Sequence, residues 1–348
     1  METDLLLSSF MPKSELRLSA HEVFQPRFPV FDVHTHFGFC YGGEAFEQTY
    51  DTGTQVRLLR EQGICRIVNL DGMYGAMLDR MLRKTEGYED FFYTFGSVDV
   101  RRLDEPDFEA QTARTLCEMK RLGIRGLKFF KDVSLVYRDS AGQFIPIDDR
   151  RLQVIWQTAA ELKLPVLIHI GDPPAFFKPI DATNERYEEL SAHPDWSFFG
   201  GGHFTFEALM NMQENLIASN PQTTFIVAHG GSWSENLTWV GQCLDRYPNM
   251  NVDISARISE FGRQPYTSHS FFEKYQNRVL FGSDGGFDNR GYHHYYRFLE
   301  TMDEYFPYSN ADVPRQGRWN IYGVRLESAV LEKIYHKNAD RLILGICE

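Results

Sequence analysis

The sequence predicts an α/β protein of the (β/α)₈ TIM-barrel class, and three features support this fold. Short apolar runs alternate with longer amphipathic runs from about residue 30 to residue 290. Eight such strand–helix pairs share about 255 residues, or about 32 residues each, which is the repeat length of an eight-stranded barrel. No GxGxxG turn follows a predicted strand, which argues against a doubly wound dinucleotide-binding sheet.

The eight predicted strands are apolar on both faces. This pattern is typical of a parallel sheet that is covered by helices, whereas a half-exposed strand alternates apolar and polar residues. The predicted strands are residues 30–37, 65–72, 91–99, 124–130, 165–172, 224–231, 250–256 and 278–285.

Amphipathic segments between these strands have the apolar spacing of a helix with one buried face. Several of them end in Gly or Pro just before the next strand, which stops a helix for conformational reasons. The clearest helical segments are residues 54–63, 106–123, 148–164, 206–221 and 235–248.

We expect one large domain, residues 30–348, preceded by an N-terminal extension of residues 1–29 that forms a small cap or hairpin. Two connections are unusually long, residues 171–203 after the fifth strand and residues 308–323. Loops of this length in a compact domain often act as lids.

Composition narrows the class of protein. With 348 residues, 43% of them hydrophobic, the chain can bury a large core. A net charge of −12 disfavours nucleic acid and anionic membranes as partners. The five scattered cysteines form no CxxC pair, and no run approaches the roughly 20 apolar residues of a membrane helix. We therefore expect a cytoplasmic enzyme with a small-molecule substrate, in the form of a homodimer.

Ligand-type residues stand at the ends of four predicted strands. His34 and His36 are two residues apart, so both side chains project to the same side of the first strand. His169, His229 and Asp284 end three later strands. Imidazole and carboxylate are standard ligands of zinc and similar ions, and they are costly to bury without a partner. The set predicts a metal site at the barrel mouth; the alternative is that these are satisfied polar residues in ordinary strand-end loops.

The order of the motifs resembles the amidohydrolase superfamily, and more narrowly its amidohydrolase-2 branch, which includes aminocarboxymuconate semialdehyde decarboxylase-like enzymes. The resemblance runs from about residue 30 to the C-terminus. The motifs that carry it are HTH at 34–36, HIGDP at 169–173, AHGG at 228–231, GSD at 282–284 and IYHKNADRLILG at 334–345.

The resemblance implies a role for each strand-end residue. His34, His36 and His169 would bind one divalent metal ion, with zinc preferred and Mn²⁺, Co²⁺ or Fe²⁺ also suited. Asp284 would bind the same ion and accept a proton from its water, whose pKa such an ion lowers toward about 7. His229 would act as an acid or base, or would bind a second metal ion; a single ion is preferred because the branch usually works with one.

Three further residues are candidates for binding substrate. Lys128 has three readings: a carboxylated lysine that bridges two metals, as in some superfamily members, a cation for a substrate carboxylate, or a rim lysine that reaches solvent. Arg257, after the seventh strand, could hold a carboxylate in a bidentate pair or form a structural ion pair. Trp233 could form an apolar pocket wall or pack under a loop.

The preferred function is metal-dependent hydrolysis of a C–O or C–N bond in a lactone, ester or amide. A lyase with the same site, which decarboxylates or hydrates an unsaturated carboxylic acid, is the first alternative, and a barrel that binds a ligand without catalysis is the second. A serine nucleophile is excluded because Ser283 lacks a flanking glycine that a GxSxG elbow requires.

Overall fold

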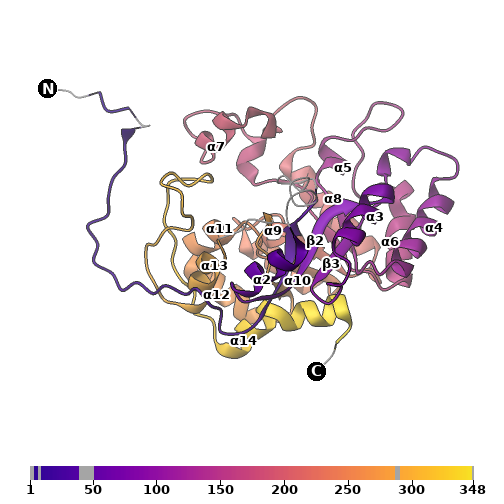
Figure 1. Ribbon diagram of the computed structural model, residues 1–348. Helices are drawn as coiled ribbons and strands as arrows, with labels where there is room; N and C mark the ends of the chain where they lie inside the picture. The colour runs from indigo at the N-terminus through magenta and orange to yellow at the C-terminus, as the bar shows by residue number, and fades with distance from the viewer. Residues whose placement is uncertain (1–3, 7–8, 39–50, 287–290, 347–348) are drawn as a thin grey trace.

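The computed structural model describes residues 4–6, 9–38, 51–286 and 291–346, and its centre is one parallel sheet (Figure 1). The strands are ordered β8-β7-β6-β5-β4-β3-β2-β1-β9, and each pair of neighbours is parallel. The strands are β1 (Val30–His36), β2 (Ile64–Met73), β3 (Phe92–Gly96), β4 (Leu127–Phe129), β5 (Val166–Ile168), β6 (Phe225–Val227), β7 (Met250–Asp253), β8 (Val279–Leu280) and β9 (Gly285–Gly286).

The sheet is closed because β8 and β9 are two parts of one chain segment. Val279 in β8 pairs with Val252 in β7, and six residues later Gly285 in β9 pairs with Thr35 in β1. Between them the Phe281 carbonyl accepts a hydrogen bond of 3.0 Å from Val33 N. The segment therefore bonds to β7 on one side and to β1 on the other, and the predicted eight-stranded (β/α)₈ barrel is confirmed.

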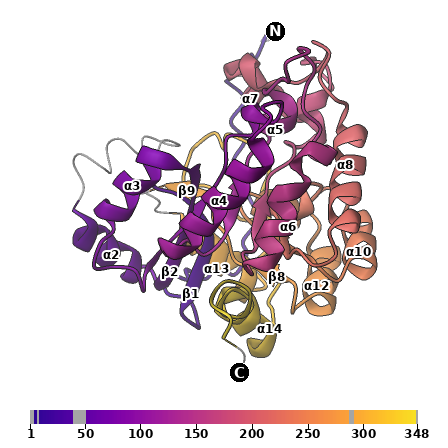
Figure 2. The ribbon, with the colours of Figure 1, turned by 90° about the vertical axis from the view of Figure 1, so that its right-hand side faces the viewer.

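Helices cover the outside of the barrel (Figure 2). Several begin at a residue whose side chain caps the first turn, as Thr205 accepts from Ala208 N and Asn236 accepts from Trp239 N. The helices are α2 (Thr52–Arg60), α3 (Gly75–Lys84), α4 (Phe108–Arg121), α5 (Asp132–Leu135), α6 (Gln153–Glu161), α7 (Tyr187–Ala192), α8 (Phe206–Ser219), α9 (Ala228–Gly231), α10 (Leu237–Arg246), α11 (Ile258–Arg263), α12 (Pro265–Lys274), α13 (Tyr292–Glu300) and α14 (Ser328–Glu332). In the part of the chain that is described, none is long and apolar enough to cross a membrane.

Two apolar clusters form the core. The larger one lies between the strands and the surrounding helices. The smaller one contains alternate strand residues such as Phe31, Val68 and Leu167, together with Ala339 and Ile343 from the C-terminal helical segment. This segment continues from α14 through wider turns at Lys333–Lys337 and Asp340–Leu344, and in Figure 2 it lies below the strands. The barrel interior is therefore packed, and the C-terminal segment closes the end opposite the strand C-termini.

Some predicted boundaries are wrong. The strand predicted at 224–231 ends at Val227, and residues 228–231 form the α9 turn. The long connection after β5 is partly helical: it contains α7 and short 3₁₀ turns at Pro174–Phe177 and Pro194–Trp196. In the described part of residues 1–29, no helix longer than a single turn and no strand forms, so these described residues form no hairpin.

The seam between β1 and the β8–β9 segment is held by the buried carboxylate of Asp32. Its Oδ1 accepts from His34 N and Ser283 N, both at 3.0 Å. Its Oδ2 accepts from Ser283 Oγ at 2.5 Å and Tyr292 OH at 2.7 Å. Burial raises the pKa of Asp32 to about 7, although these four donors act in the opposite direction. Asp32 therefore joins the first strand, the last strand and α13.

We expect Asp32→Ala to lower the free energy of unfolding by about 3 kcal/mol or more, since it leaves several buried donors without an acceptor. Urea unfolding of metal-free protein, followed by circular dichroism, measures this without a contribution from bound metal. Asp79→Ala, at an exposed position of α3, is the control and should change the value by less than about 0.5 kcal/mol. Equal effects of the two substitutions would show that Asp32 does not hold the seam.

Candidate metal centre

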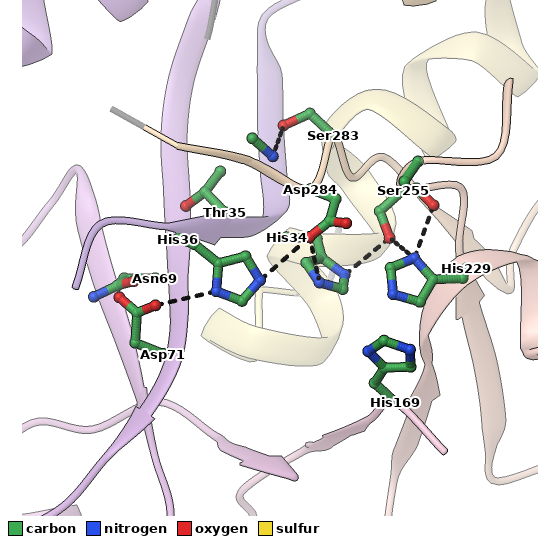
Figure 3. Close-up of polar contacts among 12 residues, drawn as sticks. His34, Thr35, His36, Asn69, Asp71, His169, His229, Ser255, Ser283 and Asp284 are labelled. Carbon is green, nitrogen blue, oxygen red and sulfur yellow. Dashed lines mark hydrogen bonds and ion pairs between the residues drawn. The ribbon is translucent and has the colours of Figure 1, made fainter. Parts of the chain in front are cut away.

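The five strand-end residues lie together at the carboxyl end of the barrel (Figure 3). His34 and His36 come from β1, His169 follows β5, His229 lies in the α9 turn, and Asp284 lies between β8 and β9. The ring of His34 has its centroid 5.4 Å from that of His36 and 5.0 Å from that of His229. The rings of His229 and His169 are 4.3 Å apart.

Three of the four predicted metal ligands form one tight group. Asp284 Oδ1 lies 3.4 Å from His34 Nε2 and 3.2 Å from His36 Nε2. One ligand atom from each of these residues lies within 4.8 Å of the other two. The side chain of Asp284 is 17% exposed, against 1% for His34 and 4% for His36, so it is the member that a molecule in the barrel mouth reaches first.

The other ring nitrogen of each first-strand histidine faces a carboxylate. His34 Nδ1 lies 2.8 Å from Asp253 Oδ2, and His36 Nδ1 lies 3.1 Å from Asp71 Oδ1. A carboxylate accepts hydrogen bonds, so this network assigns the ring proton to Nδ1 in both neutral imidazoles.

This assignment leaves a lone pair on each Nε2 directed at a carboxylate oxygen. Two acceptors at about 3.3 Å repel each other unless a cation or a proton lies between them. Nitrogen and oxygen donors in this ratio suit Zn²⁺, Mn²⁺, Co²⁺ and Fe²⁺. The residues present therefore fit a divalent metal ion.

A second group, His34, His229 and Asp253, is also close enough to hold a metal. Asp253 is fully buried, however, and both of its oxygens already accept hydrogen bonds. Oδ2 faces His34 Nδ1, while Oδ1 accepts from His229 N at 2.9 Å and from Ser255 Oγ at 2.5 Å. His229 Nδ1 in turn lies 3.0 Å from the Ser255 carbonyl. This group is better explained as a hydrogen-bonded support for the two rings.

His169 belongs to neither group, although it lies beside His229. Its Nε2 is buried and makes no hydrogen bond within the described residues, and the nearest carboxylate oxygen, Asp172 Oδ1, is 3.6 Å away. Asp172 also forms an ion pair with Lys131. The His169 imidazole therefore keeps a buried nitrogen available for a ligand.

Burial controls the charges of the cluster. It lowers the pKa of His169 to about 4, and burial together with the charge of Lys128 lowers the pKa of His34. Burial and the neighbouring His169 hold the pKa of His229 well below its ordinary value. Burial alone would raise the pKa of Asp284, but the contact with His36 and electrostatic interactions with the neighbouring imidazole rings hold it well below its ordinary value. At neutral pH His34, His169 and His229 are neutral imidazoles, and Asp284 is a carboxylate.

Backbone strain is concentrated at the same strand ends. His229, Ala256 and Asp284 have φ of 59°, 52° and 62°, a region that non-glycine residues rarely adopt. Such residues cost about 1–3 kcal/mol each and persist only where their surroundings impose them. Here Asp284 N donates to the His34 carbonyl at 2.8 Å, and His229 N donates to Asp253. The strain places the His229 and Asp284 side chains in the mouth.

The three predicted substrate-binding residues have different surroundings. Lys128 is fully buried, with its Nζ 4.8 Å from the centre of the Phe130 ring, so the prediction of a rim lysine in solvent is wrong. Arg257 is 7% exposed at the start of α11, donates to the Ala256 carbonyl, and acts electrostatically on His229. Trp233 packs against Phe206 and lines a cavity of about 610 Å³ to which none of the five cluster residues contributes.

Sequence reasoning missed Asp253 and Ser255, although both lie in the predicted seventh strand. A carboxylate in an otherwise apolar, buried strand must have partners, and this signal could have identified Asp253. Asp71, near the end of the second predicted strand, contacts His36 and so orients a ligand histidine. Asp99, at the end of the third predicted strand, has no such role, because it caps a short turn and pairs with Arg101.

The comparisons with known proteins agree with this fold. The family described as Amidohydrolase (Amidohydro_2) matches residues 31–343. No curated protein sequence matches the chain. Solved structures share the fold at low sequence identity.

A dihydroxybenzoic acid decarboxylase from Polaromonas sp. JS666, solved with manganese and the inhibitor 2-nitroresorcinol, has a TM-score of 0.58 at 13% identity, with 92% of this chain and 98% of that chain covered. A 2,6-dihydroxybenzoate decarboxylase from Rhizobium has a TM-score of 0.56 at 16% identity and covers 91% of this chain and 99% of its own. A 4-oxalomesaconate hydratase from Rhodopseudomonas palustris has a TM-score of 0.51 at 14% identity, covering 90% and 95%. Because the family match covers residues 31–343 of the 348 in the chain, the protein belongs to the amidohydrolase family, in its amidohydrolase-2 branch.

Proposed function

We propose that this protein is a metal-dependent hydrolase that cleaves a C–O or C–N bond in a small, carboxylate-bearing substrate. The observation that carries the proposal is the approach of His34 Nε2 and His36 Nε2 to one oxygen of Asp284, at 3.4 and 3.2 Å, in a barrel mouth that only partly covers the carboxylate. In this proposal His34, His36 and Asp284 bind one divalent ion, and His169 supplies the fourth ligand.

The metal ion would be zinc by preference of its nitrogen and oxygen ligands. Manganese is the first alternative, because the decarboxylase from Polaromonas was solved with manganese. When bound, the ion supplies a Lewis acid that acidifies water and polarises a carbonyl group.

The chain supplies the remaining groups. A water oxygen bonds to the carbonyl carbon, the C–O or C–N bond breaks, and the leaving group takes up a proton. Asp284, a carboxylate at neutral pH, accepts the proton of the attacking water. His229 is neutral and its Nδ1 faces the Ser255 carbonyl, so its ring proton lies on Nδ1 and its Nε2 carries a lone pair. That nitrogen can take the water proton from Asp284 and pass it to the leaving group.

The proposed substrate carries a carboxylate because two cations flank the imidazole cluster. The charge of Lys128 lowers the pKa of His34 and of His169, and the charge of Arg257 lowers the pKa of His229. Buried positive charge of this kind, in a chain with a net charge of −12, favours a small anion in the mouth.

A lyase that decarboxylates or hydrates an unsaturated acid is the second candidate. The same two cations favour it, and the structural neighbours include two decarboxylases of dihydroxybenzoates and a 4-oxalomesaconate hydratase. We propose testing both with one panel of lactones, amides, hydroxybenzoates and muconate-type acids. Proton release from a lactone, or free amine from an amide, without CO₂ would support the hydrolase. In contrast, ¹³CO₂ from a carboxyl-labelled acid, or loss of the C=C absorbance by hydration, would overturn it in favour of the lyase.

The ligand assignment predicts which variants lose metal. His34→Ala and His169→Ala should lose both bound metal and activity, because each removes a donor that the other residues cannot replace. His229→Ala should lose activity and retain most of the metal if one ion is bound. Elemental analysis and turnover are measured on the same samples.

His336→Ala, in the C-terminal segment at the opposite end of the barrel, is the control and should retain both properties. Full metal content in His34→Ala or His169→Ala would contradict the assignment of that residue as a ligand.

The carboxylates behind the ligands give a separate prediction. Asp253→Asn and Asp71→Asn should each weaken metal binding about 10- to 100-fold, because an amide holds the ring tautomer less firmly than a carboxylate. Competition with a fluorescent chelator measures the affinity. Asp99→Asn, a matched substitution at the surface, should have no effect, and an equal loss in all three variants would indicate general destabilisation.

The substrate cations give the last prediction for this site. Arg257→Met and Lys128→Met should reduce kcat/KM for a carboxylate substrate about 10- to 100-fold, or about 1.4–2.8 kcal/mol, and should affect its uncharged methyl ester much less. Steady-state kinetics on the acid and ester pair checks this. Equal losses on both substrates would show that the two cations do not recognise the carboxylate.

A further inference from the structure

The candidate metal centre is built on two neighbouring strand ends that both contain strained backbone. After β7, Ala256 has a φ of 52°, and it follows Ser255, whose hydroxyl donates to Asp253. After β8, Asp284 has a φ of 62°, and it follows Ser283. Figure 3 shows both segments at the cluster, one through Ser255 and the other through Asp284. Residues in this backbone region persist only where their surroundings impose it, so other groups must hold the two strand ends in place.

One hydroxyl group, that of Tyr295 in α13, bonds to both strand ends. It accepts a hydrogen bond of 3.0 Å from Ala256 N and donates one of 2.9 Å to the Ser283 carbonyl. The direction of each bond follows from the partner, because a backbone N–H only donates and a carbonyl oxygen only accepts. A tyrosine hydroxyl does both at once, whereas a phenylalanine can do neither. Tyr295 therefore links the residue that follows Ser255 to the residue that precedes Asp284.

The ring of Tyr295 is held independently of its hydroxyl. Tyr295 is 7% exposed, and its ring centroid lies 5.4 Å from that of Phe281 in the β8–β9 segment. Phe281 also packs against Tyr292, Tyr296 and Tyr335. Burial raises the pKa of Tyr295 above its ordinary value, so the hydroxyl keeps its proton near neutral pH. A substitution that removes only the hydroxyl should therefore keep the packing and lose the link.

Ala256 connects this link to one of the two proposed substrate cations. Its carbonyl oxygen accepts from Arg257 Nη1 at 2.9 Å and from Gln316 Nε2 at 3.0 Å. Ala256 is thus bonded through both of its backbone groups, by Tyr295 on one side and by Arg257 and Gln316 on the other. A shift of Ala256 would displace both the support of the imidazole rings and the guanidinium group.

We propose that Tyr295 is a positioning residue of the metal centre, whose hydroxyl joins the ends of β7 and β8 and so holds Asp284 against the two histidines of β1. The consequence for metal affinity rests on the proposed function, whereas the link between the strand ends does not. A ligand that is held less firmly must be ordered when the ion binds, so loss of the hydroxyl lowers the affinity.

Tyr295→Phe and Tyr296→Phe are a matched pair of variants that test the proposal. Each removes one buried hydroxyl from α13, but Tyr296 OH donates at 2.7 Å to the Gln62 carbonyl, which lies before the start of β2 and away from the mouth. Both variants should keep the circular dichroism spectrum of the wild type, because both keep the ring.

Metal affinity, measured by competition with a fluorescent chelator, should separate the two variants. The dissociation constant should rise about 10-fold in Tyr295→Phe and stay at the wild-type value in Tyr296→Phe. Wild-type affinity in Tyr295→Phe, or an equal loss in both variants, would overturn the proposal.

Hydrogen exchange of the metal-free protein tests the link without any ion. The amides of Ala256 and Asp284 should exchange faster in Tyr295→Phe than in the wild type, and at the wild-type rate in Tyr296→Phe. Wild-type exchange at Asp284 in Tyr295→Phe would overturn the proposal, whatever happens at Ala256. If the wild-type protein bound no metal, the proposed function would fail, and this measurement would still decide the role of Tyr295.

Discussion

Two buried carboxylates fix the imidazole rings on the first strand, and the rest of the site depends on this constraint. Asp253 and Asp71 each face the Nδ1 atom of one histidine, so the opposite nitrogens point with their lone pairs toward Asp284. Such an arrangement is unfavourable by itself, because acceptors face acceptors. A divalent cation bound between these atoms would remove the repulsion, because each acceptor would then coordinate the ion. Since the rings are already held in position, metal binding would be tighter than with freely rotating side chains.

The closed barrel stabilises the fold enough to tolerate this unfavourable arrangement in its mouth. Asp32 joins the first strand to the segment that carries Asp284. The strained φ of Asp284 and His229 is imposed by hydrogen bonds that their backbone N–H groups donate to the His34 carbonyl and to the Asp253 carboxylate. Burial in the mouth keeps the histidines neutral. Stability is therefore concentrated in the seam and the packed interior, while the mouth contains polar groups that only a ligand or a metal satisfies.

Much of the fold could be predicted, since strands buried on both faces and their repeat length are properties of local sequence. The convergence of His34, His36, His229 and Asp284 also follows, because the carboxyl ends of all barrel strands meet at one mouth. The support by Asp253 and Ser255 could not be read from spacing, as it depends on which strands become neighbours after closure. The burial of Lys128 and the extended form of the N-terminal extension could not be predicted for a related reason. Burial is decided by packing between distant segments, and neither an isolated lysine nor a short extension carries a periodic pattern.

The metal assignment is tested most directly by the stoichiometry and position of the ion in protein purified without added metal. Elemental analysis combined with an anomalous difference map at the absorption edge gives both quantities. The account predicts about one divalent ion per chain, with a single anomalous peak between His34, His36 and Asp284. No metal after reconstitution, or a peak elsewhere in the barrel, would contradict it.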